Sequence, residues 1–99
     1  MLDFYFMNDS DIKPHSPGEQ NLEFAGSLDD KTFQNLKTKG IIESRYDYYS
    51  DFRWGEALVK HIHSMIHQKG GMTDHDVKIL KAFLDQAMER QCGLIAFGD

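Results

Sequence analysis

Apolar and polar residues alternate at the start of the chain, as in a half-buried β-strand. In residues 2–7, every second position from Leu2 is Leu or Phe, so the apolar side chains share one face. Residues 8–21 contain both prolines and many turn-forming residues, which predicts a loop. Residues 22–25 (LEFA) predict a short second strand. The continuous apolar run at residues 93–97 (GLIAF) predicts a buried strand.

Helical spacing of apolar residues dominates the middle of the chain. It predicts helices over residues 28–39, 51–68 and 73–91. Ser27 opens an S-x-x-D pattern that resembles a capping box, and Ser50 and Thr73 are the expected N-caps of the other two helices. Gly40 follows the first helix, as is typical of a helix C-terminus.

Strands at the two ends with helices between them predict the fold class. We expect a small α+β sandwich that forms one domain over residues 1–99. The terminal strands should pair as neighbours in a small sheet. About three helices should pack on it, with 51–68 and 73–91 as an antiparallel hairpin on one face.

Composition narrows the expected partners and location. The 99 residues have a net charge of −5 and no cluster of Lys or Arg, which argues against nucleic acid or an anionic membrane and favours a basic protein as partner. Cys92 is the only cysteine, which excludes an intrachain disulfide. No stretch has the pattern of a secretion signal or the length of a membrane span, so we expect a cytoplasmic location.

Histidines on the second predicted helix raise the question of a metal site. His63 and His67 are four residues apart, and Glu56 precedes His63 by seven, so the three side chains lie on one stripe. Two histidines and one carboxylate form a ligand set for zinc or iron. Lys60 lies in the same row, however, and its ammonium would compete with a divalent cation. We therefore interpret the stripe as a solvated helix face and expect neither metal nor another cofactor.

Signals for catalysis are missing from the sequence. It has neither the G-x-S-x-G nucleophile motif nor a glycine-rich phosphate loop. Cys92, at the junction into the last predicted strand, is expected to be a packing residue. Asp74 and Asp76, on either side of His75, suit the first turn of a helix. We predict a protein without enzymatic activity.

Five of the twelve aromatic residues lie within residues 46–54. Phe52 and Trp54 suit a core position at the base of a helix. The tyrosines are harder to bury together, since in an extended segment Tyr46 and Tyr48 face one side and Tyr49 the other. At least one of the three rings should therefore be exposed.

Exposed tyrosines beside carboxylates have the composition of a protein-binding surface. We expect Asp47, Tyr48, Tyr49 and Asp51 to form its centre, with Trp54 supporting them from beneath. The whole predicted surface comprises Glu43, Tyr46, Asp47, Tyr48, Tyr49, Asp51, Arg53 and Trp54.

The stretch Asp47-Tyr48-Tyr49-Ser50-Asp51, in a small acidic chain, resembles the immunity proteins that bacteria make against their own secreted toxins. The colicin DNase immunity proteins use acids and a neighbouring tyrosine pair against a basic nuclease. Barstar likewise presents aromatics and carboxylates to its ribonuclease. The resemblance covers these five residues with overall size and charge. It implies inhibition by occlusion, in which the chain covers a basic site of a toxin or a patch next to it.

Two alternatives stay open at this point. In the first, the chain is a homo-oligomeric structural or regulatory module that buries the tyrosine run across a two-fold interface. In the second, it is a small metal-binding protein that uses Glu56, His63 and His67.

Overall fold

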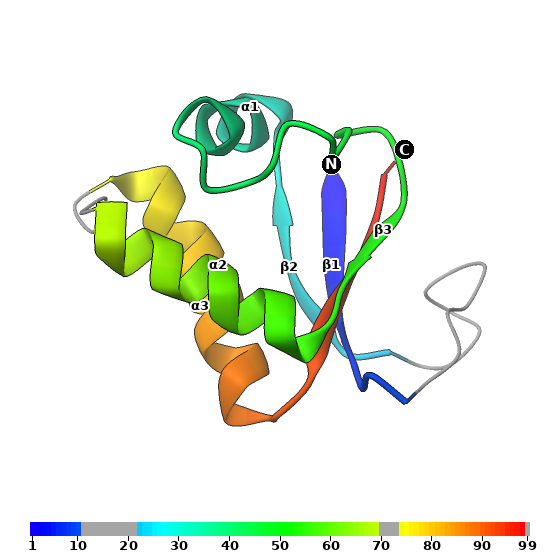
Figure 1. Ribbon diagram of the computed structural model, residues 1–99. Coiled ribbons are helices and arrows are strands. Elements are labelled where there is room, and N and C mark those ends of the chain that lie inside the picture. Colours follow the sequence, from blue (N-terminus) through cyan, green and yellow to red (C-terminus); the bar gives the residue numbers. More distant parts are fainter. Residues whose placement is uncertain (11–21, 70–73, 99) are drawn as a thin grey trace.

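The computed structural model describes residues 1–10, 22–69 and 74–98. Within these ranges the chain has the predicted α+β class, with four strands and three helices (Figure 1). In chain order they are β1 (Leu2–Met7), β2 (Phe24–Leu28), α1 (Asp30–Thr38), β3 (Phe52–Trp54), α2 (Glu56–Lys69), α3 (His75–Glu89) and β4 (Gly93–Phe97).

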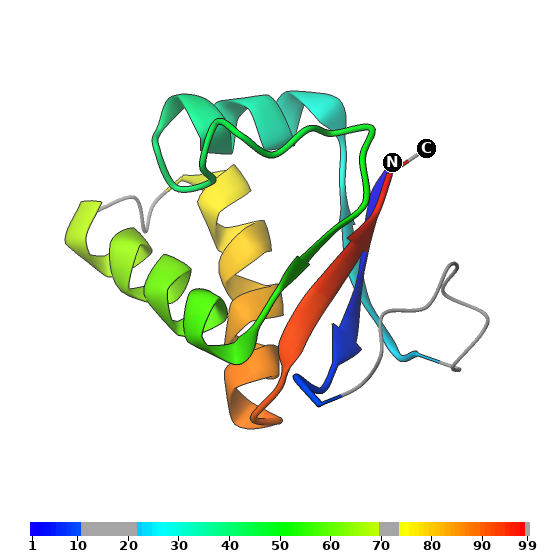
Figure 2. The same cartoon turned by 45° about the vertical axis from the view of Figure 1, so that its right-hand side comes forward.

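The strands form one antiparallel sheet in the order β2-β1-β4-β3. β1 and β4 are neighbours at its centre, with Asp3 opposite Phe97 and Met7 opposite Gly93. The prediction that the two terminal strands pair is confirmed. α2 and α3 run in opposite directions on one side of the sheet. α1 lies near the end of the sheet at which β1 begins (Figure 2).

The main core lies between the sheet and the helices. Leu2, Phe4 and Phe6 face it from β1, as their alternation predicts, and Phe4 packs against Phe83 of α3 and Trp54 of β3. The other face of the sheet carries a smaller buried cluster of Met7, Ile95 and Phe97. β4 is therefore buried on both faces, which explains its continuous apolar sequence.

The predicted helix at residues 51–68 is wrong at its N-terminal end. Residues 52–54 form β3, which pairs Phe52 with Ala96 and Trp54 with Leu94, and Ser50 is not a helix cap. The approach of β3 to β4 depends on Gly93, since a Cβ there would lie 2.3 Å from the carbonyl oxygen of Trp54. Pairing with a distant strand thus decides the conformation of this segment.

Two boundaries near β2 also differ from the prediction. The strand expected at residues 22–25 is shifted to β2, which contains Ser27. The N-cap of α1 is therefore Asp29, whose carboxylate accepts a hydrogen bond from the backbone N–H of Thr32 at 2.7 Å. α1 is accordingly shorter than the expected helix 28–39.

The third helix is shorter than predicted at both ends. α3 replaces the expected helix 73–91, and its N-cap is Asp74, which accepts hydrogen bonds from the backbone N–H groups of Asp76 and Val77. The predicted cap Thr73 lies outside the described residues, as does most of the predicted loop 8–21.

α2 has its N-terminus capped by a residue far away in the chain. Asp9 Oδ1 accepts a hydrogen bond from the backbone N–H of Glu56 at 2.9 Å. Next to it, Arg53 donates to the carbonyl oxygen of Asn8 at 2.6 Å. The chain just after β1 therefore holds the junction between β3 and α2. No helix in the described ranges is both long and apolar enough to span a membrane.

Candidate functional site

Residues 43–51, called the tyrosine segment below, join α1 to β3. The chain reverses at Gly40, whose φ of +75° is the left-handed conformation that glycine adopts readily. The backbone N–H of Ile41 then bonds to the carbonyl oxygen of Leu36 at 3.0 Å. Ile41 and Ile42 are both buried, so the tyrosine segment starts from a fixed point on the core.

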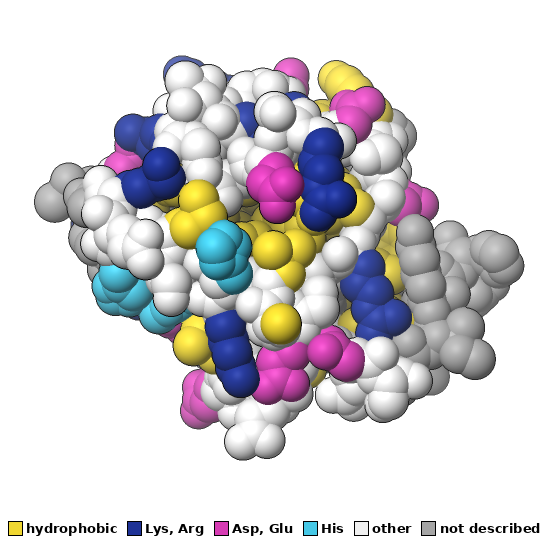
Figure 3. All heavy atoms as spheres, in the orientation of Figure 1, with side chains coloured by type: hydrophobic (Ala, Val, Ile, Leu, Met, Phe, Trp, Pro, Cys, Tyr) yellow, Lys and Arg dark blue, Asp and Glu magenta, His cyan; other side chains and the backbone are white. Residues whose placement is uncertain are grey.

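Tyr46 lies over two aromatic residues of β3. Its ring centroid is 4.8 Å from that of Phe52 and 6.0 Å from that of Trp54. Lys37 of α1 donates a 2.7 Å hydrogen bond to the Tyr46 carbonyl oxygen, and Arg45 donates to the Tyr46 hydroxyl at 2.9 Å. On the face of the molecule drawn in Figure 3, hydrophobic side chains gather between α2 and the segment that joins α1 to β3.

Tyr48 is a core residue. Only 7% of its surface is exposed, and its ring lies 5.8 Å from that of Phe33 in α1. The expectation that the Tyr48 ring meets solvent at the centre of a binding surface is therefore wrong, because that ring fills the space between the segment and α1. Trp54 is completely buried, which agrees with a supporting position beneath the segment.

Tyr49 is the exposed aromatic residue of the segment. Its side chain is 63% exposed, which confirms that the three tyrosines are not all buried. The ring makes an edge contact with the buried Tyr48, at 5.0 Å and 87° between planes. Its backbone N–H bonds to Asp47 Oδ1 at 3.1 Å. The position of Tyr49 is thus fixed by the buried Tyr48 and by the exposed Asp47.

The predicted acidic residues flank this exposed ring along the chain. Asp47 and Asp51 are both exposed, and Asp51 Oδ1 accepts a hydrogen bond from the backbone N–H of Gly98 at 3.0 Å. Glu43, at the start of the segment, forms an ion pair with Arg45 at 3.2 Å. Asp47 therefore contacts the backbone of Tyr49, whereas Asp51 binds the backbone of Gly98, and each carboxylate orders the local backbone.

The indole N–H of Trp54 has no hydrogen-bond acceptor among the described residues, although it is fully buried. Leaving a buried donor unpaired costs about 1–3 kcal/mol. The ring is packed by Phe4, Phe52 and Tyr46, which offer aromatic faces and edges. The sequence contains no signal for this unpaired donor, since it depends on which groups surround the ring.

The stripe of metal-ligand candidates makes ordinary polar contacts. Glu56 forms an ion pair with Lys60 at 3.2 Å, as the shared row suggests. His63 lies 4.7 Å from His67, ring to ring, and its Nε2 contacts Asp85 of α3 at 2.8 Å. Within residues 1–10, 22–69 and 74–98, no group of three or more His, Cys, Asp or Glu could hold a metal ion.

Asp85 of α3 makes a contact with α2 that was not predicted from the sequence. Burial raises the pKa of its carboxyl group, but hydrogen bonds from Lys81 and His63 outweigh this and leave the pKa below its ordinary value. Lys81 lies 2.7 Å from Asp85, and their spacing of four residues indicates this pair within α3. The contact of Asp85 with His63 joins two helices and has no such signal in the sequence.

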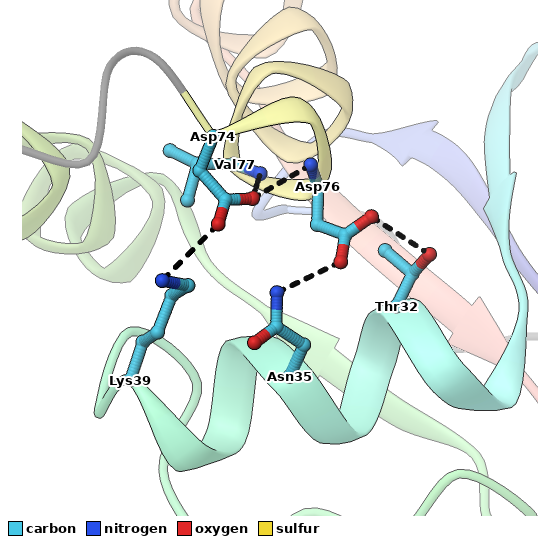
Figure 4. A network of polar contacts seen from close by, with 6 residues as sticks. All are labelled: Thr32, Asn35, Lys39, Asp74, Asp76 and Val77. Carbon is cyan, nitrogen blue, oxygen red and sulfur yellow. Dashed lines mark hydrogen bonds and ion pairs between the residues drawn. The ribbon is translucent and has the colours of Figure 1, made fainter.

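A polar network fixes α1, and with it the start of the tyrosine segment, against α3 (Figure 4). Asp76 accepts hydrogen bonds from Asn35 at 2.8 Å and from Thr32 at 3.2 Å. Asp74 pairs with Lys39 at 3.1 Å. The hydrogen bond from Lys39, together with those from backbone N–H groups at the start of α3, lowers the pKa of Asp74. These acids thus serve both their own helix and its contact with α1.

A cavity of about 290 Å³ lies elsewhere, beside the end of β1. Its lining includes Arg90, whose guanidinium lies 4.2 Å above the Phe6 ring and pairs with Glu23. The buried Cys92 also lines it, and burial raises the pKa of that thiol. None of the predicted partner-binding residues lines this cavity.

Comparisons with models of protein families, with curated proteins and with solved structures found no match.

Proposed function

We propose that this chain is a non-enzymatic protein-binding domain of the immunity or antitoxin type, which acts in the cytoplasm and neutralises a basic toxin domain by covering part of its surface. The observation that carries the proposal is the 63% exposed ring of Tyr49, which contacts the buried Tyr48 and is flanked in the sequence by the exposed Asp47 and Asp51.

The exposed ring suits a binding hot spot. Tyrosine offers a large contact area with few rotatable bonds and is enriched among residues that dominate binding energy. Tyr49 is also ordered before binding, because its ring contacts Tyr48 and its backbone bonds to Asp47. A pre-ordered side chain loses less conformational entropy when a partner covers it. In this proposal Tyr48 and Trp54 support the surface and do not touch the partner.

Charge favours a cationic partner. The chain has a net charge of −5, and Asp47 and Asp51 flank the exposed ring in the sequence. Carboxylates around a hot spot speed the encounter with a basic surface and disfavour acidic ones. A secreted nuclease or another toxin with a basic surface has this chemistry.

The test uses the purified chain and the basic C-terminal domain of any secreted toxin encoded next to it in the source genome. We expect Tyr49→Ala to weaken binding by about 2 kcal/mol, measured by isothermal titration calorimetry. Phe24→Ala is the matched control, because Phe24 is 53% exposed but lies on β2 opposite Tyr5, at the other end of the sheet.

Equal affinities for the wild type and Tyr49→Ala would remove the basis of the proposal. Light scattering on the free chain tests the homo-oligomeric alternative, since a dimer that buries Tyr49 would dissociate on Tyr49→Ala.

A further inference from the structure

We propose that Gly98, just after β4, is a positioning residue for the surface around Tyr49. Because Gly98 has no side chain, the backbone of residues 48–50 can lie directly against it, and this contact holds the Tyr49 ring in the orientation that a partner covers. The inference rests on the proposed function for the act of binding. The contact itself is a property of the isolated chain.

The backbone of the tyrosine segment passes too close to Gly98 for a residue with a side chain. A Cβ at this position would lie 2.6 Å from the carbonyl carbon of Tyr49, 2.7 Å from the carbonyl oxygen of Tyr48 and 2.8 Å from the backbone nitrogen of Ser50. The φ angle of Gly98 lies outside the left-handed region. The close approach, and not an unusual backbone conformation, therefore requires glycine at this position.

The part of the segment that rests on Gly98 is a closed turn. The backbone N–H of Tyr49 bonds to Asp47 Oδ1 at 3.1 Å, and that of Ser50 bonds to the Asp47 carbonyl oxygen, also at 3.1 Å. The Ser50 hydroxyl donates to the same carbonyl oxygen at 2.9 Å. These bonds make residues 47–50 one unit, so the contact with Gly98 sets the position of the whole turn.

Both sides of the contact are anchored in the fold. Phe97, just before Gly98, is 9% exposed and lies opposite Asp3 of β1. Tyr48, in the turn, is 7% exposed. The backbone N–H of Gly98 also donates to Asp51 Oδ1 at 3.0 Å, just after the turn. A side chain at position 98 must therefore displace the turn or separate the end of β4 from it, and in both cases the support of Tyr49 is lost.

NMR of the free chain tests the contact. Gly98→Ala should shift the ring signals of Tyr49, weaken the Overhauser effect between this ring and that of Tyr48, which lies 5.0 Å away, and speed exchange of the Tyr49 amide about tenfold. Gly26→Ala is the matched control, because a Cβ there would lie 2.2 Å from the Phe83 ring, and β2 is at the opposite edge of the sheet from β3. Tyr49 signals in Gly98→Ala that match those of the wild type would overturn the proposal.

Asp51 provides a second test if Gly98→Ala does not fold. Asp51→Ala removes the acceptor of the Gly98 N–H, so exchange of the Tyr49 amide should be about threefold faster than in the wild type. Asp51→Asn keeps a side-chain oxygen that can accept this bond and should exchange at the wild-type rate. Equal exchange rates in the two variants would show that the bond to Gly98 does not hold the turn.

A double-mutant cycle tests whether Gly98 acts on binding through Tyr49. Titration calorimetry with the same toxin domain compares the wild type, Gly98→Ala, Tyr49→Ala and the double variant. We expect Gly98→Ala to weaken binding about tenfold in the wild type and by less than about twofold when residue 49 is already alanine. Equal losses in the two backgrounds would mean that Gly98 acts on the fold as a whole, and would overturn the proposal.

The measurements with and without the partner separate the inference from the proposed function. If Gly98→Ala shifts the Tyr49 ring in the free chain and Tyr49→Ala binds the toxin domain as the wild type does, only the proposed function fails. If Tyr49→Ala weakens binding and Gly98→Ala changes neither the ring signals nor the affinity, only the inference fails.

Discussion

Asp9 caps a helix that begins 47 residues later in the chain, through a 2.9 Å hydrogen bond from the backbone N–H of Glu56 to its carboxylate. An N-cap is usually the residue just before the helix, because the side chain must reach the first free N–H groups. In this protein the position just before α2 directly follows the strand β3. The capping carboxylate comes instead from Asp9, in the chain that leaves β1. The cap therefore joins three elements, β1, β3 and α2.

The Asp9 cap should contribute to the stability of the fold. Asp9→Ala should lower the free energy of unfolding by about 1 kcal/mol, the usual cost of removing an N-cap, while Asp9→Asn should keep most of it. Urea unfolding followed by circular dichroism measures both. Asn8→Ala is the control, since Asn8 acts through its backbone carbonyl, which accepts from Arg53. A loss in Asn8→Ala as large as that in Asp9→Ala would contradict the assignment.

The neighbouring tyrosines should behave differently on truncation. Tyr48→Ala removes a ring that is 7% exposed and should cost about 3 kcal/mol of unfolding free energy. Tyr49→Ala removes a ring that is 63% exposed and should change stability by less than about 0.5 kcal/mol. Chemical denaturation of the two variants side by side measures this difference. Equal losses would mean that Tyr49 is also part of the core.

The contact between α1 and α3 depends on Asp76. Asp76→Ala leaves Asn35 and Thr32 without their acceptor and should lower the free energy of unfolding by about 1–2 kcal/mol. Amide exchange in α1 should rise more than in β4. Asp30→Ala is the matched control, because Asp30 is exposed and bonds within α1 to Gln34. Equal effects of the two variants would show that the network does not hold the helices together.

Stability should fall in acid. Asp29, Asp74 and Asp85 all have pKa values below the ordinary 3.8, so folding favours their ionised forms. Their stabilisation is fully present above 3.8 and is lost as the pH falls through the lowered values. The urea midpoint should therefore drop across that range, and Asp85→Asn should make the drop smaller. Lys81→Met should act in the same direction, and a drop as steep as in the wild type would contradict the role of Asp85.

Much of the fold follows from residue patterns that act over short distances. The alternation in β1 and the helical spacing in α3 predict which side chains reach the core, and Leu2, Phe4, Leu80 and Leu84 are all buried. The continuous apolar run of β4 predicts a buried strand, and the structure buries it on both faces. In each case the burial of a side chain depends mainly on its own place in a regular element, so local periodicity is sufficient.

Contacts between distant parts of the chain determined which residues of the candidate site are buried and which are exposed. The sequence places Tyr48 and Tyr49 side by side, and only the position of Phe33 in α1 makes the first a core residue and leaves the second exposed. The same holds for β3, which needs β4 as its partner, and for the cap supplied by Asp9. Patterns of residue type determined the elements and their charges. The pairing of groups far apart in sequence determined which rings are exposed and which donor is left unpaired, because burial and hydrogen bonding there depend on neighbours that only the folded chain brings together.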